Sequence, residues 1–259
     1  MSDLDSPLLW LAITCVFVFA GFIKGVIGVG LPTVVMGLLG AVMPPAQAAS
    51  LLVLPTVVTN IWQIAAGPSF LPLVRRLWTM LAGICIGTWV GSGLLAGGNA
   101  EQTRFALGVI LALYGCMGFT TLRFIVSARA ERWLSPVMGV ITGFLTGATG
   151  VSVIPALPYI QALGLKKEEL IQALALSPMV SAIALGISLA GGGIMGLSLA
   201  GASLLALVPA LAGMYFGQWL RLRVSETVFR RVFFAGLIAL GAWLALRNLG
   251  VPASVTSDG

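Results

Sequence analysis

The feature of this sequence that most limits its fold is a series of long apolar segments almost free of charge. Between Asp5 and Arg75 the chain carries one charged side chain, Lys24. Over all 259 residues, 59% are hydrophobic and 8% are charged, whereas a soluble domain has about 25% charged residues. Because so few charges cannot cover the surface of a protein in water, the sequence predicts an integral membrane protein embedded in a lipid bilayer.

The apolar segments indicate helices and not strands. Apolar and polar residues do not alternate along them, which excludes an outer-membrane barrel. A helix needs roughly 20 residues to cross a bilayer, so the chain has room for about eight to ten crossings. The predicted fold class is therefore an all-α polytopic membrane protein.

An internal repeat divides the chain into two halves. Residues 21–30 read GFIKGVIGVG and residues 143–152 read GFLTGATGVS, so two glycine-rich stretches recur at an offset of 122. Further along the chain Pro55 matches Pro178, GTWVG at 87–91 matches GMYFG at 213–217, and Arg104 matches Arg230. This conserved order predicts a duplication, with one transmembrane repeat in residues 1–128 and a second in residues 129–259.

Each half is predicted to hold one long stretch broken by glycine and proline, followed by three ordinary spans. In the first half the broken stretch is 8–43 and the spans are 46–66, 72–97 and 101–126. In the second half the broken stretch is 133–163 and the spans are 168–190, 196–220 and 226–249.

The distribution of Lys and Arg decides how the broken stretches lie. If each crosses the membrane once, the positive residues outside them divide six against seven, which gives no orientation. If each is a hairpin that returns to its own side, eleven lie on one side and two on the other, which fits the excess of positive charge in cytoplasmic loops. The eleven are Arg75, Arg76, Arg123, Arg129, Arg132, Lys166, Lys167, Arg221, Arg223, Arg230 and Arg231, and the two are Arg104 and Arg247.

The charge count therefore favours inverted repeats, each a broken helical hairpin followed by three transmembrane helices, with both termini outside the cytoplasm. The sequence leaves open whether the short segment from Leu31 to Met43 crosses the whole bilayer.

The paired breaks are the predicted binding site. Lipid cannot satisfy the backbone groups that a broken helix exposes, so such breaks line a cavity within the protein. Interrupted segments at matching positions of two repeats indicate a transporter binding site, and glycine-rich backbone amides favour anions. The alternative is that these glycines only allow helices to pack closely. The site residues predicted on this basis are Gly25, Gly28, Gly30, Pro32, Gly147 and Gly150.

Lys24 is the predicted anion ligand, because a charge within the membrane is costly unless it is compensated. The alternative is that its long side chain reaches a membrane surface. Thr146 occupies the matching position of the second half, and Thr149 and Ser152 follow it. These three hydroxyls are predicted to donate hydrogen bonds to the anion. The polar residues near Pro55 and Pro178, namely Asn60, Gln63, Ser177 and Ser181, could complete the site, and the alternative for each is a hydrogen bond between helices.

At these residues the chain resembles the TauE/SafE sulfite exporter family, also called the toluene-sulfonate uptake permease family. GFIKGVIGVGLP at 21–32 and GFLTGATGVSVIP at 143–155 are similar to the glycine-rich, proline-terminated motif that opens each half in this family. The segment AASLLVLPT at 48–56 resembles the Ala-Thr-Ser segment that follows, with Ala49 where threonine is common. The resemblance implies secondary transport, in either direction, of sulfite, an organosulfonate or a short organic acid across the bacterial inner membrane.

Other classes of function fit the sequence less well or remain open. The chain has no histidine, which excludes Ser-His dyads and the usual zinc sites, and no pair of carboxylates lies within an apolar segment. An enzyme, a cofactor and a nucleic-acid partner are therefore not expected. An anion channel and an accessory membrane subunit are the alternatives to a transporter. A proton or sodium is the expected type of coupling ion, and the sequence also allows a homo-oligomer.

Overall fold

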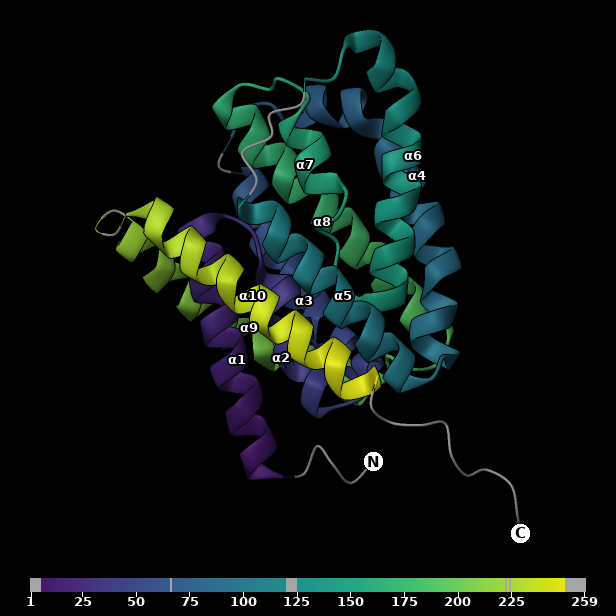
Figure 1. Cartoon of the computed structure of the whole chain (residues 1–259), viewed down its shortest axis with the longest axis vertical. Coiled ribbons are helices and arrows are strands. Elements are labelled where there is room, and N and C mark those ends of the chain that lie inside the picture. Colours follow the sequence, from purple (N-terminus) through teal and green to yellow (C-terminus); the bar gives the residue numbers. More distant parts are fainter. Residues whose placement is uncertain (1–5, 66, 120–124, 222, 224, 250–259) are drawn as a thin grey trace.

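The computed structural model describes residues 6–65, 67–119, 125–221, 223 and 225–249. These residues form ten helices and no strand, as the predicted all-α class requires (Figure 1). The helices are α1 (Pro7–Ile27), α2 (Leu31–Val42), α3 (Pro45–Ala65), α4 (Phe70–Gly97), α5 (Ala100–Phe119), α6 (Ala128–Thr149), α7 (Ala156–Gln161), α8 (Lys167–Gly191), α9 (Leu197–Arg221) and α10 (Glu226–Leu249).

The helices follow the segments expected from the sequence. The broken stretch 8–43 forms α1 and α2, and the stretch 133–163 forms α6 and the short α7. The span predicted over 101–126 begins as α5 and ends at Phe119, and residues 120–124 lie outside the described part of the chain.

Seven of the described helices are long and apolar enough to cross a membrane, namely α1, α3, α4, α5, α8, α9 and α10. The second limb of each broken stretch is too short to do so. Helix α2 has 12 residues and α7 has six, which at 1.5 Å per residue span about 18 Å and 9 Å of a hydrocarbon core about 30 Å thick. Both returning limbs must therefore be covered by other helices.

The helix pairs have the pattern expected if the two halves are related by symmetry. Helix α1 packs mainly on α9 and α6 mainly on α4, while α3 packs on α8 and α5 on α10. In the predicted repeat, α1 corresponds to α6, α3 to α8, α4 to α9 and α5 to α10. Exchanging the two halves therefore converts the pair α1–α9 into the pair α6–α4, and it leaves the pairs α3–α8 and α5–α10 unchanged. In Figure 1, α1 begins at the lower end of the molecule and α6 begins at the upper end. We propose on this basis that residues 1–128 and 129–259 are inverted repeats.

Glycines allow the two main helix pairs to approach backbone to backbone. A Cβ atom added to Gly21 or Gly25 of α1 would overlap the carbonyl oxygens of Ala210 or Met214 in α9. The same holds between α6 and α4, where a Cβ on Gly143 would overlap the carbonyl oxygen of Ile84. Small residues give close packing in membranes, where helix association relies on van der Waals contact. These contacts hold α1 and α6 rigidly up to the points where they end.

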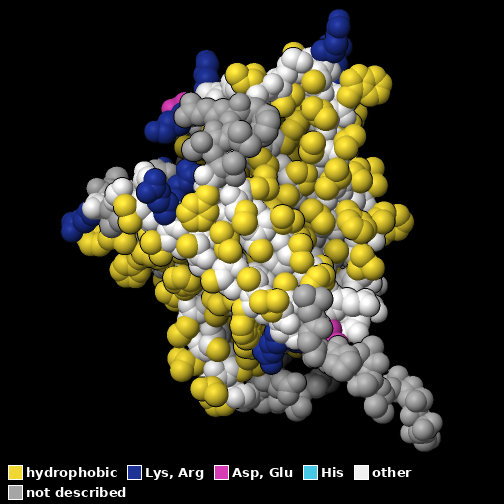
Figure 2. Space-filling view, in the orientation of Figure 1, with side chains coloured by type: hydrophobic (Ala, Val, Ile, Leu, Met, Phe, Trp, Pro, Cys, Tyr) yellow, Lys and Arg dark blue, Asp and Glu magenta, His cyan; other side chains and the backbone are white. Residues whose placement is uncertain are grey.

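Positive side chains gather toward one end of the molecule. Figure 2 shows the visible Lys and Arg side chains mostly in the upper half of the molecule, at the upper end and on the left flank where α9 ends and α10 begins, with one basic patch near the lower end. Arg123 of the predicted cytoplasmic group lies outside the described residues. By the same charge rule, the prediction is that this half of the molecule faces the cytoplasm.

The two ends of α9 provide a test of this orientation. Ser198 at its start and Ser225 just beyond its end are both exposed. In a variant in which Cys15, Cys85 and Cys116 are replaced, since all three are exposed, we expect Ser198→Cys to react with an impermeant thiol reagent added outside the cell. Ser225→Cys should react only after the membrane is opened. Labelling of both from the same side would contradict the topology.

Candidate functional site

Both broken stretches end their first helix in the same way. Gly28 caps the end of α1 with φ 88°, and Gly150 caps the end of α6 with φ 75°. Glycine is favoured at such left-handed positions because it has no Cβ. The Gly28 N–H donates to the Lys24 carbonyl and the Gly150 N–H to the Thr146 carbonyl, each at 2.7 Å. The glycine pair matched in the sequence therefore forms two equivalent helix ends inside the protein.

The short helix α2 begins directly after the first break. Gly30 precedes it with φ 109°, and Pro32 lies in its first turn, where a missing N–H is tolerated. At its other end, Arg104 of α5 donates to the carbonyl oxygens of Gly40 at 2.9 Å and Met43 at 3.3 Å. These bonds satisfy carbonyl groups at the end of α2 and fix the returning limb.

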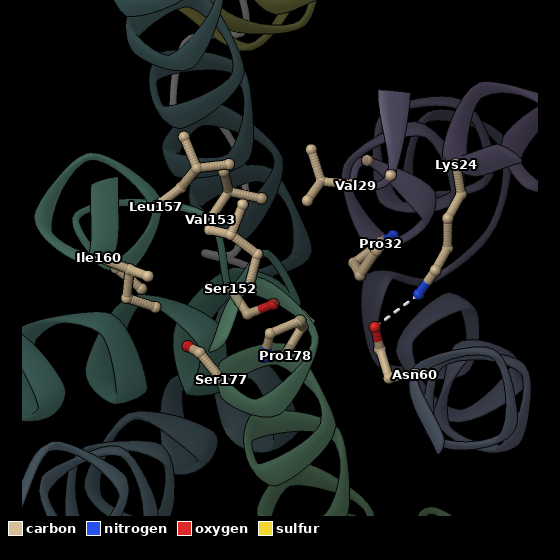
Figure 3. A pocket seen from close by; sticks show the side chains of 14 residues that line it. Lys24, Val29, Pro32, Asn60, Ser152, Val153, Leu157, Ile160, Ser177 and Pro178 are labelled. Carbon is tan, nitrogen blue, oxygen red and sulfur yellow. Dashed lines mark hydrogen bonds between the residues drawn. The ribbon is translucent and has the colours of Figure 1, made fainter. Parts of the chain in front are cut away.

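A cleft of about 410 Å³, including the part open to solvent, lies between the two breaks. Figure 3 shows Lys24 and Asn60 on one side of it and Ser152, Ser177 and Pro178 on the other. The cleft is lined from the first half by Lys24, Gly28, Val29, Gly30, Pro32 and Asn60, and from the second by Ser152, Val153, Ala156, Leu157, Ile160, Leu174, Ser177 and Pro178.

Lys24 lies in this cleft with 4% of its surface exposed. Its Nζ donates to Asn60 Oδ1 at 2.6 Å, and Asn60 Nδ2 donates to the Thr56 carbonyl at 2.8 Å, which fixes the amide (Figure 3). Lys24 therefore does not reach a membrane surface. It forms no ion pair with the described residues, and an ammonium group has three donors, so two remain for a ligand.

A second cavity of about 240 Å³, again including the part open to solvent, adjoins the first. The two share Pro32, Ser152 and Pro178. The remaining lining of the second cavity consists of Ala49, Leu52, Val53, Thr56, Thr146, Gly150, Ser181, Ala182 and Leu185.

Three hydroxyl groups that line these cavities have no hydrogen-bond partner among the described residues. Thr56, Ser177 and Ser181 are at most 2% exposed, and their hydroxyl oxygens are unpaired. Ser177 and Ser181 lie one turn apart on the same face of α8. A buried hydroxyl without a partner costs about 1–3 kcal/mol, so these groups are placed where a ligand or water would satisfy them.

The hydroxyls of Thr146 and Thr149 are used within their own helix. Thr146 Oγ1 donates to the Thr142 carbonyl at 2.8 Å, and Thr149 Oγ1 donates to the Leu145 carbonyl at 2.7 Å. Their protons are therefore not available to an anion in this structure, whereas the sequence predicted that both hydroxyls would donate to it. Threonine in a helix commonly bonds back to the preceding turn, which the sequence pattern did not take into account.

The predicted site residues fall into three groups. Lys24, Gly28, Gly30, Pro32, Asn60 and Ser152 line the first cavity, and Thr146, Gly150 and Ser181 line the second. Four lie elsewhere: Gly25 and Gly147 pack against the backbones of α9 and α4, Gln63 donates to the Ile171 carbonyl at 3.1 Å, and Thr149 bonds within α6.

The sequence indicated Ser177 as a polar residue that could complete the site, and it does line the first cavity, whereas Thr56 and Pro178 were left out of the predicted site. Ser177 and Pro178 are adjacent on α8, and Thr56 follows the matching Pro55 on α3. Their proximity to the repeated prolines was the available signal, but the orientation of a single hydroxyl depends on the packing of α3 against α8.

The family model described as "Sulfite exporter TauE/SafE" matches residues 13–244, which is most of the chain. No curated protein and no solved structure matches.

The close approach of α1 and α9 generates a prediction on stability. Gly25→Ala would force the helices apart, since the new Cβ overlaps the Met214 carbonyl oxygen. We expect a loss of about 1–3 kcal/mol, typical of overpacking, seen as a lower melting temperature in detergent. Gly201→Ala is the matched control, because a Cβ at this helical position meets no atom within 4 Å. Equal melting temperatures for the two variants would contradict the packing role of Gly25.

Proposed function

The chain belongs to the TauE/SafE sulfite exporter family, and from this premise we propose that it is a secondary transporter of a small anion across the bacterial inner membrane. The proposed substrates are sulfite, an organosulfonate or a short organic acid, bound between the two broken stretches. The observation that carries the proposal is Lys24, a buried cation in the cleft between the breaks that has no carboxylate partner among the described residues.

The electrostatics of the cleft favour an anion. Removing an ammonium group from water costs several kcal/mol unless an opposite charge and hydrogen bonds compensate. Asn60 supplies one neutral acceptor, and Lys24 is the only charged residue among those lining either cavity. A bound anion would supply the missing charge, and the hydroxyls of Ser152, Ser177 and Ser181 are within the same pair of cavities to donate hydrogen bonds to its oxygens.

The burial of the site favours a carrier over an open channel. Lys24, Asn60 and Ser152 are at most 4% exposed, so an anion cannot pass Lys24 in this conformation without a movement of the surrounding helices. Inverted repeats with a binding site between discontinuous helices are typical of transporters that expose the site to each side in turn.

Lys24 is the residue whose substitution tests the proposal. Lys24→Met keeps most of the side-chain volume and removes the charge and its donors. Loss of a charge-assisted hydrogen bond, roughly 1.5–3 kcal/mol, should weaken anion binding by about 10- to 150-fold. Lys24→Arg should be intermediate, since it keeps the charge in a different shape.

The measurements are sulfite binding by calorimetry and counterflow of labelled sulfite in proteoliposomes, with protein that stays monodisperse. Lys167→Met is the matched control, because this lysine is exposed at the start of α8. If Lys24→Met binds sulfite with unchanged affinity, Lys24 is not a ligand of the anion. Flux of the size of a single-channel current would identify a channel, and no flux at all would favour an accessory subunit.

A further inference from the structure

Four arginines lie close together in the chain where α9 ends and α10 begins. Arg221 is the last residue of α9, Arg223 lies in the turn, and Arg230 and Arg231 follow in α10. We call these four residues the arginine cluster, and all four are exposed. Glu226 is the only acidic residue among the described residues after α9. The cluster therefore sets four positive charges against one negative charge.

The arginine cluster has no polar partner within the described part of the chain. The ion pair recorded there joins Arg76 of α4 to Glu131 of α6, and none of the four guanidinium groups forms a hydrogen bond with a described residue. Their recorded contacts are with aromatic rings. Arg223 lies 4.1 Å from the centre of the Trp219 ring, and Arg230 lies 5.8 Å from that of Phe234. A guanidinium group held over a ring keeps its N–H donors free for an acceptor.

The first half of the chain uses the matching arginine differently. Arg104 of α5 corresponds to Arg230 of α10 in the predicted repeat, and it donates to the carbonyl oxygens at the end of α2. The carbonyl of Leu163, just beyond α7, accepts its bond from Arg76 of α4 at 3.2 Å. Arg230 is thus free of the role that Arg104 performs. The turn between α4 and α5 contains no arginine, so the framework of a repeat does not require such a cluster.

An exposed apolar surface adjoins the arginine cluster. Tyr215 and Phe216 near the end of α9 are 71% and 61% exposed, and Val228 and Val232 near the start of α10 are 60% and 69% exposed. In Figure 1 this end of the α9–α10 pair extends to the left beyond the other helices, and Figure 2 shows basic side chains there with hydrophobic ones beneath them. In a bilayer the apolar side chains contact acyl chains, and the arginines reach the headgroups.

This order of groups matches the chemistry of an anionic phospholipid. Guanidinium groups bind phosphate oxygens with charge-assisted, often bidentate hydrogen bonds. Four or more basic residues beside a transmembrane helix are typical of binding to anionic lipids. A soluble phosphate would satisfy the arginines alone, whereas a phospholipid would also cover the apolar side chains next to them.

We propose that the end of α9 and the start of α10 form a binding site for an anionic phospholipid, whose phosphate is held by the arginine cluster and whose acyl chains lie along Phe216, Val228 and Val232. The inference goes beyond the proposed function, and it does not depend on which anion is transported.

The lipid site adjoins the first break of the transporter. Phe229, next to Arg230, packs edge-to-face on Phe22 of α1, with 5.8 Å between the ring centres. Phe233 lies against the break itself, since a Cβ added to Gly30 would be 3.3 Å from its ring. A lipid that binds the start of α10 therefore binds a segment in contact with the break. Because it binds the folded protein, it should raise the melting temperature.

Two phospholipids with identical acyl chains test the inference. Phosphatidylglycerol is anionic, whereas phosphatidylcholine carries the same phosphate together with a choline cation that the arginines would repel. Each lipid is titrated into the protein in a non-ionic detergent, and the rise in melting temperature is followed. We expect the phosphatidylglycerol midpoint at a concentration at least about fivefold lower, which corresponds to about 1 kcal/mol for one arginine near an anionic lipid. Added salt should reduce this ratio.

A charge-matched pair of variants tests whether the arginine cluster is the site. Replacing its four arginines by glutamine should bring the ratio of the two midpoints close to one. The control replaces four other exposed basic residues by glutamine, namely Arg75, Arg129, Arg132 and Lys167. It removes the same charge and should keep the wild-type ratio. A variant with lysine at all four cluster positions should be intermediate, because it keeps the charge and loses the planar fork.

The ratio compares two lipids on the same protein, so a general loss of stability does not change it. Equal midpoints for the two lipids in the wild-type protein would overturn the inference. An equal fall of the ratio in the cluster variant and in the control would also overturn it, because binding would then follow net charge alone. Loss of the phosphatidylglycerol effect in millimolar inorganic phosphate would identify a site for soluble phosphate instead of a lipid.

Discussion

Every backbone N–H and C=O group in the membrane interior must find a partner inside the protein, because lipid offers none. The structure follows from how the chain meets this constraint where its helices are interrupted. Helices α1 and α6 end at Gly28 and Gly150, whose left-handed conformation returns a hydrogen bond to the helix just completed. Arg104 bonds carbonyls at the end of α2, and Ser203 bonds the carbonyl freed by Pro55. Irregular backbone is thus confined to the interior, where a binding site can form.

Close helix packing keeps these interruptions in place. The pairs α1–α9 and α4–α6 meet through glycines, with no side chain between the backbones. Such contacts lack a hydrophobic driving force in lipid and depend on fit alone. Each break therefore lies at the end of a helix that is held along its length, and the two breaks face each other across the cleft.

The candidate site is marked by polar groups whose hydrogen-bonding capacity the described residues do not fill. One ammonium group has a single neutral acceptor, and three buried hydroxyls have no partner. At the proposed repeat, Lys24 of the first half corresponds to Thr146 of the second. The proposed site is therefore asymmetric, with the ammonium group contributed by the first half and the buried hydroxyls of Ser177 and Ser181 by the second.

The sequence by itself determined the membrane class, the ten helical segments and the positions of the two breaks, because hydrophobic length and glycine-proline interruptions are local properties. It also placed Lys24, Asn60 and Ser152 in the cleft, since charge and polarity are costly in an apolar segment wherever it packs. Only the tertiary structure decided that Gly25 and Gly147 serve helix packing, that Gln63 bonds to the backbone of α8, and that Thr56 lines the second cavity. The physical reason is that a glycine or a hydroxyl has the same local preference in a packed interface and in a binding site. Its role depends on which helix lies opposite, and that is set by contacts between residues far apart in the chain.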